Sequence, residues 1–162
     1  MTTETSRTDR RTSLMFEIRY GRIACEREVR LFGRIETTLR FIELAGATAV
    51  VVGVLGKVSM LAVVSGFLLA LIPIIGTVYD PRGKAFEAER MRERFAALAE
   101  EACGLDDDAL ERRIRRMQTE AGPDPVKAVR FIAYNDAVAE SGLDPAASYE
   151  LNAWQRFVAA MA

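Results

Sequence analysis

Few residues of this chain have the types and the spacing that catalysis or metal binding requires. Histidine is absent, which excludes His-based triads and histidine metal sites. The two cysteines, Cys25 and Cys103, are too far apart in the sequence for a CxxC-type zinc site, and we expect both to be reduced and unreactive in the cytosol. No glycine-rich dinucleotide motif or P-loop occurs. We therefore predict no enzyme activity, no catalytic residue, no metal and no cofactor.

Two charged clusters stand out among the remaining polar residues. Three aspartates, Asp106 to Asp108, could hold a hard cation, but acids at a helix start usually cap the helix and complement its positive end. Four arginines, at 112, 113, 115 and 116, could grip a phosphate of a lipid or nucleotide. We favour capping for the aspartates and a solvated helix face for the arginines. No basic stripe of the kind that neutralises many phosphates occurs, so no nucleic-acid partner is expected.

The strongest pattern is the absence of charge from the middle of the chain. Between Glu43 and Asp80 the only charged residue is Lys57. Core helices of soluble proteins keep a polar face, so long uncharged runs indicate a lipid environment. The predicted fold is all-α: a membrane protein with a two-helix transmembrane hairpin over residues 41–79 and flanking cytoplasmic helices. A soluble helical protein that buries a central hairpin is the alternative, but few helices remain to cover it.

Within the hairpin, residues 41–55 form a first span that is slightly short for a bilayer core of about 30 Å, and residues 58–79 form a second, uncharged one. Basic residues flank both outer ends, which favours the inner membrane with both termini in the cytoplasm. Long charged side chains reach the headgroups near helix ends. We therefore expect four membrane-edge charges: Arg40, Glu43, Lys57 and Arg82.

Small, hydroxyl-bearing and helix-bending residues recur within the two spans. Small residues let membrane helices approach closely, and a proline kinks a helix that neighbouring helices can still accommodate. Hydroxyl groups could line a narrow aqueous path, although they more often bond to their own helix backbone. The predicted helix-packing and possible pore-lining residues are Gly46, Thr48, Gly53, Ser59, Ser65 and Pro73.

The segments outside the hairpin carry helical periodicity and residues that typically begin or end helices. We expect a disordered tail over 1–13, a cytoplasmic or interfacial helix over 14–40, and a cytoplasmic helical domain over 80–162. Three Asp-Pro pairs, at 80–81, 124–125 and 144–145, predict helix starts, and Gly104 and Gly142 predict helix ends. The domain should then contain four helices, at about 81–102, 107–120, 125–141 and 145–161.

The last two of these helices carry apolar stripes, which predicts an antiparallel helix pair with Trp154 anchored in its core. Tyr134 and Asn135 lie on the penultimate helix. They are candidates for contact with a partner protein.

The layout resembles the SLATT family, predicted two-transmembrane effector domains of bacterial conflict systems. The likeness covers the chain from about Leu14 onward, and its motifs are Asp124-Pro125, Ala133-Tyr134-Asn135, Gly142-Leu143 and Gln155-Arg156. The resemblance implies a pore-forming or membrane-disrupting effector in antiphage defence that a partner encoded nearby restrains or triggers. It carries over no catalytic residue.

We therefore expect a homo-oligomeric membrane effector that permeabilises or depolarises the inner membrane when triggered. One hairpin cannot enclose water, so a pore would need several copies. The main alternative is a membrane anchor or scaffold that recruits a partner through its cytoplasmic helices. A phage holin-like protein is a third interpretation, for which the long cytoplasmic tail would be unusual.

Overall fold

A computed structural model describes residues 2–56, 59–120 and 126–162, and every regular element in them is helical. The elements are α1 (Thr2–Leu55), α2 (Ser59–Tyr79), α3 (Pro81–Glu101), the 3-10 turn η1 (Ala102–Gly104), α4 (Asp107–Glu120), α5 (Lys127–Glu140), the 3-10 turn η2 (Pro145–Ala147) and α6 (Ala153–Met161). They form two compact units. The hairpin unit comprises Leu31–Ala85, and the helical domain comprises Met1–Arg30 with Phe86–Ala162.

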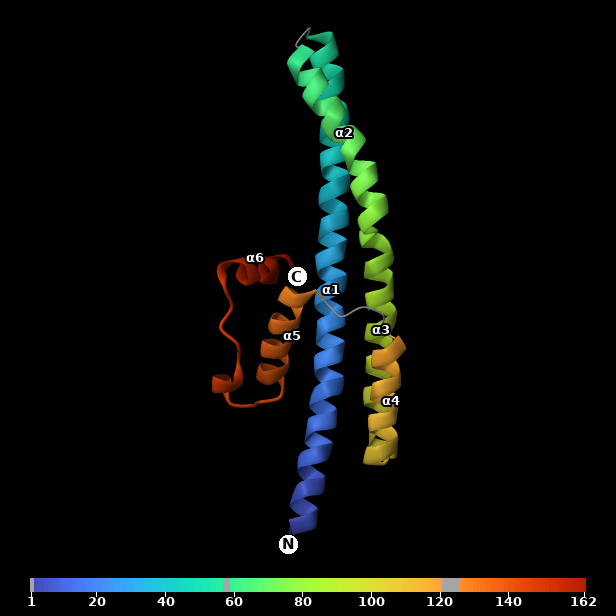
Figure 1. Cartoon of the computed structure of the whole chain (residues 1–162), viewed down its shortest axis with the longest axis vertical. Helices are drawn as coiled ribbons and strands as arrows, with labels where there is room; N and C mark the ends of the chain where they lie inside the picture. The colour runs from blue at the N-terminus through green and yellow to red at the C-terminus, as the bar shows by residue number, and fades with distance from the viewer. Residues whose placement is uncertain (1, 57–58, 121–125) are drawn as a thin grey trace. The chain divides into compact units, whose positions relative to one another are not determined.

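Helix α1 is continuous where the sequence suggested two separate segments (Figure 1). It is helical from Thr2 to Leu55, with no break near residue 40. The predicted disordered tail over 1–13 is also wrong for residues 2–13, which are helical. The physical reason is that Arg10 and Arg11 form ion pairs with acids of α4, which hold this end of α1 in place.

In the helical domain, α1 packs on α3 and α4 through one face and on α5 through another, as Figure 1 shows. The first core contains Leu14 and Ile18 of α1, and its α3 residues recur at alternating spacings of three and four, which keeps them on one side of the helix. The second core is smaller and joins Ile23 and Ala24 to two alanines of α5. The buried members from α3, η1 and α4 are Met91, Phe95, Leu98, Ala102, Leu110 and Ile114.

Gly21 lets α1 and α3 approach closely, because a Cβ at this position would lie 2.5 Å from the buried ring of Phe95. We expect Gly21→Ala to destabilise the domain by about 1 kcal/mol, since overpacking costs about 1–3 kcal/mol and the better helix propensity of alanine returns about 1 kcal/mol. Gly33→Ala is the matched control, because no other helix places an atom within 4 Å of its Cβ position. It should be neutral or stabilising. Thermal unfolding of both variants checks the difference, and equal midpoints would contradict the close packing.

At the two Asp-Pro pairs that the structure describes, the aspartate caps the helix start, as predicted. Asp80 Oδ1 accepts a hydrogen bond of 3.0 Å from Gly83 N, and Asp144 Oδ1 accepts one of 2.9 Å from Ala146 N. The third pair, Asp124-Pro125, lies outside the described residues. The predicted helix end at Gly142 is confirmed by its φ of +66° and by the bond from Leu143 N to Val138 O.

The predicted helix over 145–161 is wrong in its middle. Only η2 and α6 are helical, and residues 148–152 are not. Tyr149 is held by Asn135 in a non-helical conformation, and Asn152 starts α6 afresh through a capping box with Gln155. The prediction of an antiparallel pair fails for the same reason, because the short α6 crosses near one end of α5 (Figure 1). Trp154 is 66% exposed and stacks on Phe157, so it is not a core anchor.

In the hairpin unit, α2 returns beside the second half of α1 and leaves most apolar side chains uncovered. Within the described chain, two helices are long and apolar enough to cross a membrane, and only 6% and 12% of their most apolar windows are buried. Two packed helices hide only one stripe each, so the remaining apolar surface faces outward. Large exposed side chains include Phe41, Leu44, Leu55, Met60, Val63, Phe67 and Val78.

Candidate functional site

The hairpin unit contains a cavity of about 500 Å³ at the end of the hairpin that carries its charges. We call it the edge cavity. Helix α1 lines it with Glu36, Leu39, Arg40 and Glu43, whose spacing of three, four and seven places them on one face. The facing wall comes from the last turns of α2 and the start of α3: Ile72, Pro73, Gly76, Thr77, Asp80 and Arg82. Three of the four predicted membrane-edge charges therefore meet at one place; the fourth, Lys57, lies outside the described residues.

The edge cavity contains charges of both signs. Arg40 pairs with Glu36 across one helical turn, with an N–O distance of 2.6 Å. Glu43 lies about 10 Å further along the axis from Glu36, at about 1.5 Å per residue. With Asp80 and Arg82, the ionisable groups are three carboxylates and two guanidinium groups, so the cavity has a formal charge of −1. It therefore does not favour a simple anion.

Asp80 adopts a backbone conformation that side-chain-bearing residues rarely take. Its φ is +40°, and it joins α2 to α3 while its carboxylate caps α3. Such a conformation costs about 1–3 kcal/mol and recurs at functional sites. Aspartate and asparagine tolerate it best. The sequence predicted the cap, but no pattern in it indicated the strained backbone.

Lys84 makes a contact that the sequence did not indicate. Its Nζ lies 3.8 Å from the centroid of the Tyr79 ring and 5.8 Å from that of Phe32. A cation over an aromatic face is attracted by about 0.5–2 kcal/mol, depending on its exposure to water. The basic and aromatic residues at the end of α2 were each visible in the sequence. Their pairing required knowledge of the turn at Asp80.

Two glycines of α1 within the hairpin lie in close surroundings. A Cβ on Gly46 would lie 3.2 Å from the Leu69 side chain, and Gly53 is buried. The hydroxyl of Thr48 donates to Leu44 O at 3.0 Å, so it satisfies its own backbone, as the favoured interpretation expected. Ser65 is only 5% exposed, whereas Pro73 lies within α2 and lines the edge cavity. Ser59 begins α2.

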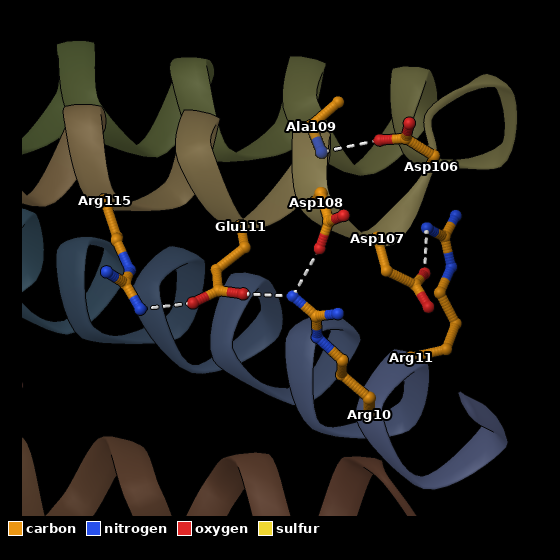
Figure 2. A network of polar contacts seen from close by, with 8 residues as sticks. All are labelled: Arg10, Arg11, Asp106, Asp107, Asp108, Ala109, Glu111 and Arg115. Carbon is orange, nitrogen blue, oxygen red and sulfur yellow. Dashed lines mark hydrogen bonds and ion pairs between the residues drawn. The ribbon is translucent and has the colours of Figure 1, made fainter. Parts of the chain in front are cut away.

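In the helical domain, the three aspartates at the start of α4 are used as caps and ion-pair partners. Asp106 Oδ1 accepts a hydrogen bond from Ala109 N at 2.6 Å. Arg10 of α1 contacts Asp108 and Glu111, and Glu111 also contacts Arg115, as Figure 2 shows. Within the described chain, no group of three His, Cys, Asp or Glu side chains is arranged to hold a metal ion. The capping interpretation is confirmed, and the ion pairs add to it.

The network of Figure 2 shifts the pKa of its members in opposite directions. The hydrogen bond from Arg10, followed by the charge of Arg115, lowers the pKa of the Glu111 carboxyl. The hydrogen bond to Glu111 raises the pKa of Arg10. A depressed carboxyl pKa stabilises the fold above the ordinary pKa of that group, and this contribution is lost as the pH falls through the depressed value. The ion pairs therefore persist at neutral pH.

Arg11 makes the most extensive contact of the α1 end. Its guanidinium pairs with Asp107 at 3.1 Å and donates to the backbone carbonyls of Leu105 and Ala102. The Asp107 side chain is 14% exposed, so this ion pair is better shielded from water than the Arg10 pairs. We call the contacts of Arg11 with Asp107 and the two carbonyls the α1–α4 clasp.

Three further arginines of α1 bind α5 and the turn that follows it. Arg22 pairs with Glu140 at 2.8 Å, Arg27 pairs with Asp136 at 2.8 Å, and Arg19 donates to Ser141 Oγ at 2.6 Å. The sequence suggested that the α1 arginines mark the approach to a membrane. Their acidic partners are more than 100 residues away, so sequence spacing does not reveal these pairs.

Tyr134 and Asn135 make contacts within the chain. Asn135 donates to Tyr149 O at 2.8 Å and accepts from Tyr149 N at 2.7 Å. The Tyr134 ring packs edge-on against Phe16 and Tyr149, with centroids 5.6 and 5.0 Å apart. These contacts fix the segment after η2. A partner contact by this pair stays a prediction.

The four-arginine cluster of α4 is a solvated face, as expected. Arg113 pairs with Glu101 and Arg115 with Glu111, and all four arginines are exposed. Glu120, at the end of α4, pairs with Arg94 of α3.

The two free cysteines differ in environment. Burial, followed by the charge of Glu28, raises the pKa of the Cys25 thiol to about 12, whereas Cys103 is exposed. The thiolate is the nucleophile, so Cys25 should resist alkylation until the pH approaches 12. The exposure of Cys103 corrects the expectation that both thiols are unreactive, because its sulfur is open to a reagent. Maleimide labelling at pH 8 with mass-spectrometric readout checks this. Equal labelling rates would contradict the burial of Cys25.

The comparisons with known proteins identify no relative: no protein-family model, curated protein or solved structure matches the chain.

Proposed function

We propose that this chain is a membrane-inserted hairpin protein that assembles into an oligomer and permeabilises or depolarises the bacterial inner membrane. The observation that carries the proposal is the uncovered apolar surface of the hairpin unit. Large side chains on both helices are more than half exposed, for example Phe41, Val63 and Val78. A monomeric soluble protein rarely exposes a contiguous apolar surface of this kind, whereas lipid covers it without cost.

Oligomerisation follows from the geometry of a single hairpin. Two helices cannot surround an aqueous path, so several copies are needed. The close approach at Gly46 and Leu69 keeps the two spans of one copy together, which leaves their outer faces for lipid and for other copies.

The biological setting rests on the resemblance to the SLATT family. That resemblance supports a role in antiphage defence, with a signalling or sensor partner that triggers the effector.

The test measures membrane potential and dye entry in bacteria that express the wild type, Gly46→Leu or Gly66→Leu. Both variants stay apolar and should insert. Only Gly46→Leu clashes with Leu69, since no other helix places an atom within 4 Å of the Cβ position of Gly66. The proteins are overexpressed, because a high concentration drives assembly by mass action without the trigger. We expect depolarisation by the wild type and Gly66→Leu, and little by Gly46→Leu at equal membrane abundance. A sealed membrane with all three proteins inserted would contradict permeabilisation.

A membrane anchor or scaffold is the second candidate, and one observation favours it. Trp154 and Phe157 stack with centroids 5.6 Å apart while remaining 66% and 56% exposed. Exposed aromatic pairs are typical of protein-binding surfaces. The scaffold proposal predicts that Trp154→Ala releases a co-purifying protein while the membrane stays sealed.

A further inference from the structure

We propose that the edge cavity binds the headgroup of a zwitterionic phospholipid with a primary ammonium, of the phosphatidylethanolamine class. The inference rests on the proposed insertion of the hairpin, because it places the cavity at the level of the headgroups. It adds a lipid ligand and a specificity that the permeabilising function does not require.

The size and shape of the cavity fit a bound group. Its volume of about 500 Å³ lies within the range of small-ligand sites in proteins. One face of α1 forms one wall, and the end of α2 with the start of α3 forms the other. The charges of α1 are spread over about 10 Å from Glu36 to Glu43. A headgroup with two separated charges can occupy such a length, whereas a single small ion would contact only part of it.

The apolar part of the lining points to a ligand that continues into acyl chains. Leu39, Ile72 and Pro73 line the same cavity as the charged residues. Pro73 lies six residues before the end of α2, on the side nearer the apolar middle of the hairpin. A soluble zwitterion would leave this surface in water, whereas a phospholipid covers it with its glycerol and first methylenes.

The charge of the cavity selects the class of headgroup. Two guanidinium groups, Arg40 and Arg82, suit a phosphodiester. Arginine carries five N–H donors, so the bond from Arg40 Nη2 to Glu36 leaves other donors of Arg40 for phosphate oxygens. The Glu43 carboxylate and the Asp80 oxygen that does not cap α3 then remain for a cation. With a net formal charge of −1, the cavity disfavours purely anionic lipids such as phosphatidylglycerol. Both charges of a zwitterionic headgroup find partners.

The cation should be a primary ammonium rather than choline. A primary ammonium donates three hydrogen bonds, and charge-assisted bonds to carboxylates are among the strongest in proteins. A quaternary ammonium donates none and is recognised by aromatic cages instead. None of the described lining residues of the edge cavity is aromatic. We therefore expect phosphatidylethanolamine to be preferred over phosphatidylcholine by about tenfold, which corresponds to one such hydrogen bond.

The experiment is native mass spectrometry of the detergent-purified full chain with equimolar phosphatidylethanolamine, phosphatidylcholine and phosphatidylglycerol. The variants are Glu43→Gln and Asp80→Asn, which remove charge but keep shape. Asparagine also tolerates the positive φ of Asp80 and can still cap α3. Glu100→Gln, an exposed residue of α3 outside the cavity, is the control. We expect the preference to fall to about equality in the two cavity variants and to stay near tenfold in the wild type and the control.

Three outcomes decide the inference. A preference that survives both cavity variants would overturn it, as would a preference for phosphatidylglycerol. Soluble glycerophosphoethanolamine is offered to the same protein, and binding as tight as that of the intact lipid would assign the cavity to a soluble ligand instead. Carbonate extraction of membranes from expressing cells distinguishes failure of the headgroup site from failure of membrane insertion. A chain that resists extraction but shows no lipid preference refutes only the headgroup site, whereas an extracted chain refutes insertion itself.

Discussion

Phe67→Arg is expected to abolish membrane insertion, whereas Phe86→Arg is expected to leave it unchanged. The two phenylalanines are similarly exposed, at 65% and 71%, but Phe67 lies near the middle of α2 and Phe86 lies on α3 beyond the apolar stretch. An arginine at the centre of a span costs about 2.5–3.5 kcal/mol and the lost phenylalanine adds a few tenths. The insertion equilibrium should therefore fall by roughly a hundredfold or more.

The exposure of Phe67 makes this substitution discriminating. In a soluble protein, an exposed phenylalanine replaced by arginine has little effect on stability and improves solubility. In a membrane protein, the same position faces lipid. The measurement is the fraction of each variant that resists carbonate extraction, with Phe67→Leu as the size-matched apolar control. Full retention of Phe67→Arg in the membrane would contradict a lipid-facing position.

Arg11→Ala should destabilise the helical domain by about 2–3 kcal/mol. The substitution removes the ion pair with the poorly exposed Asp107 and leaves the carbonyls of Leu105 and Ala102 without this donor. Breaking a fully buried ion pair costs about 3–5 kcal/mol, and the partial exposure of Arg11 lowers this value. For a chain of this length, the loss corresponds to a decrease of roughly 5–10 °C in the unfolding temperature.

Arg11→Lys separates the charge of the clasp from its geometry, and Arg90→Ala is the control. Arg11→Lys keeps the charge but lacks the planar fork that reaches both Asp107 and the carbonyls, so it should recover only part of the loss. Arg90→Ala, an exposed residue of α3, should have no effect. Circular dichroism gives the unfolding temperatures. Hydrogen exchange should show faster exchange at the start of α1 in Arg11→Ala. Unchanged exchange there would mean that the clasp does not hold α1 against α4.

The sequence predicted the helical elements well where local chemistry sets their limits. The starts of α3 and η2 and the end of α5 follow from Asp-Pro pairs and from Gly142, because these residues act on their immediate neighbours. The sequence did not predict that α1 is helical before residue 14, nor that the chain is non-helical just before α6. Both depend on contacts between distant residues, namely Arg11 with Asp107 and Asn135 with Tyr149.

The edge cavity was predicted only in its parts. Arg40, Glu43 and Arg82 were identified as charges near the ends of the apolar runs, because charge segregation is visible in a sequence. Their convergence around one cavity depends on how α2 packs against α1, and the φ of +40° at Asp80 sets the direction in which Arg82 follows. Trp154 was misplaced because exposed and buried aromatic stripes have the same helical spacing.

The most direct test of the central claim, a hairpin that crosses the membrane with both flanking segments on one side, is labelling with an impermeant polymer-linked maleimide. One protein keeps Cys103 as its single cysteine, with Cys25 replaced by serine. The other lacks both native cysteines and has a single cysteine introduced by Gly56→Cys, at the end of the hairpin between α1 and α2. Both are expressed in intact spheroplasts. We predict that the position 56 cysteine is labelled from outside and that Cys103 is labelled only after detergent is added. Protection of both positions, or labelling of both from outside, would contradict the membrane-spanning hairpin.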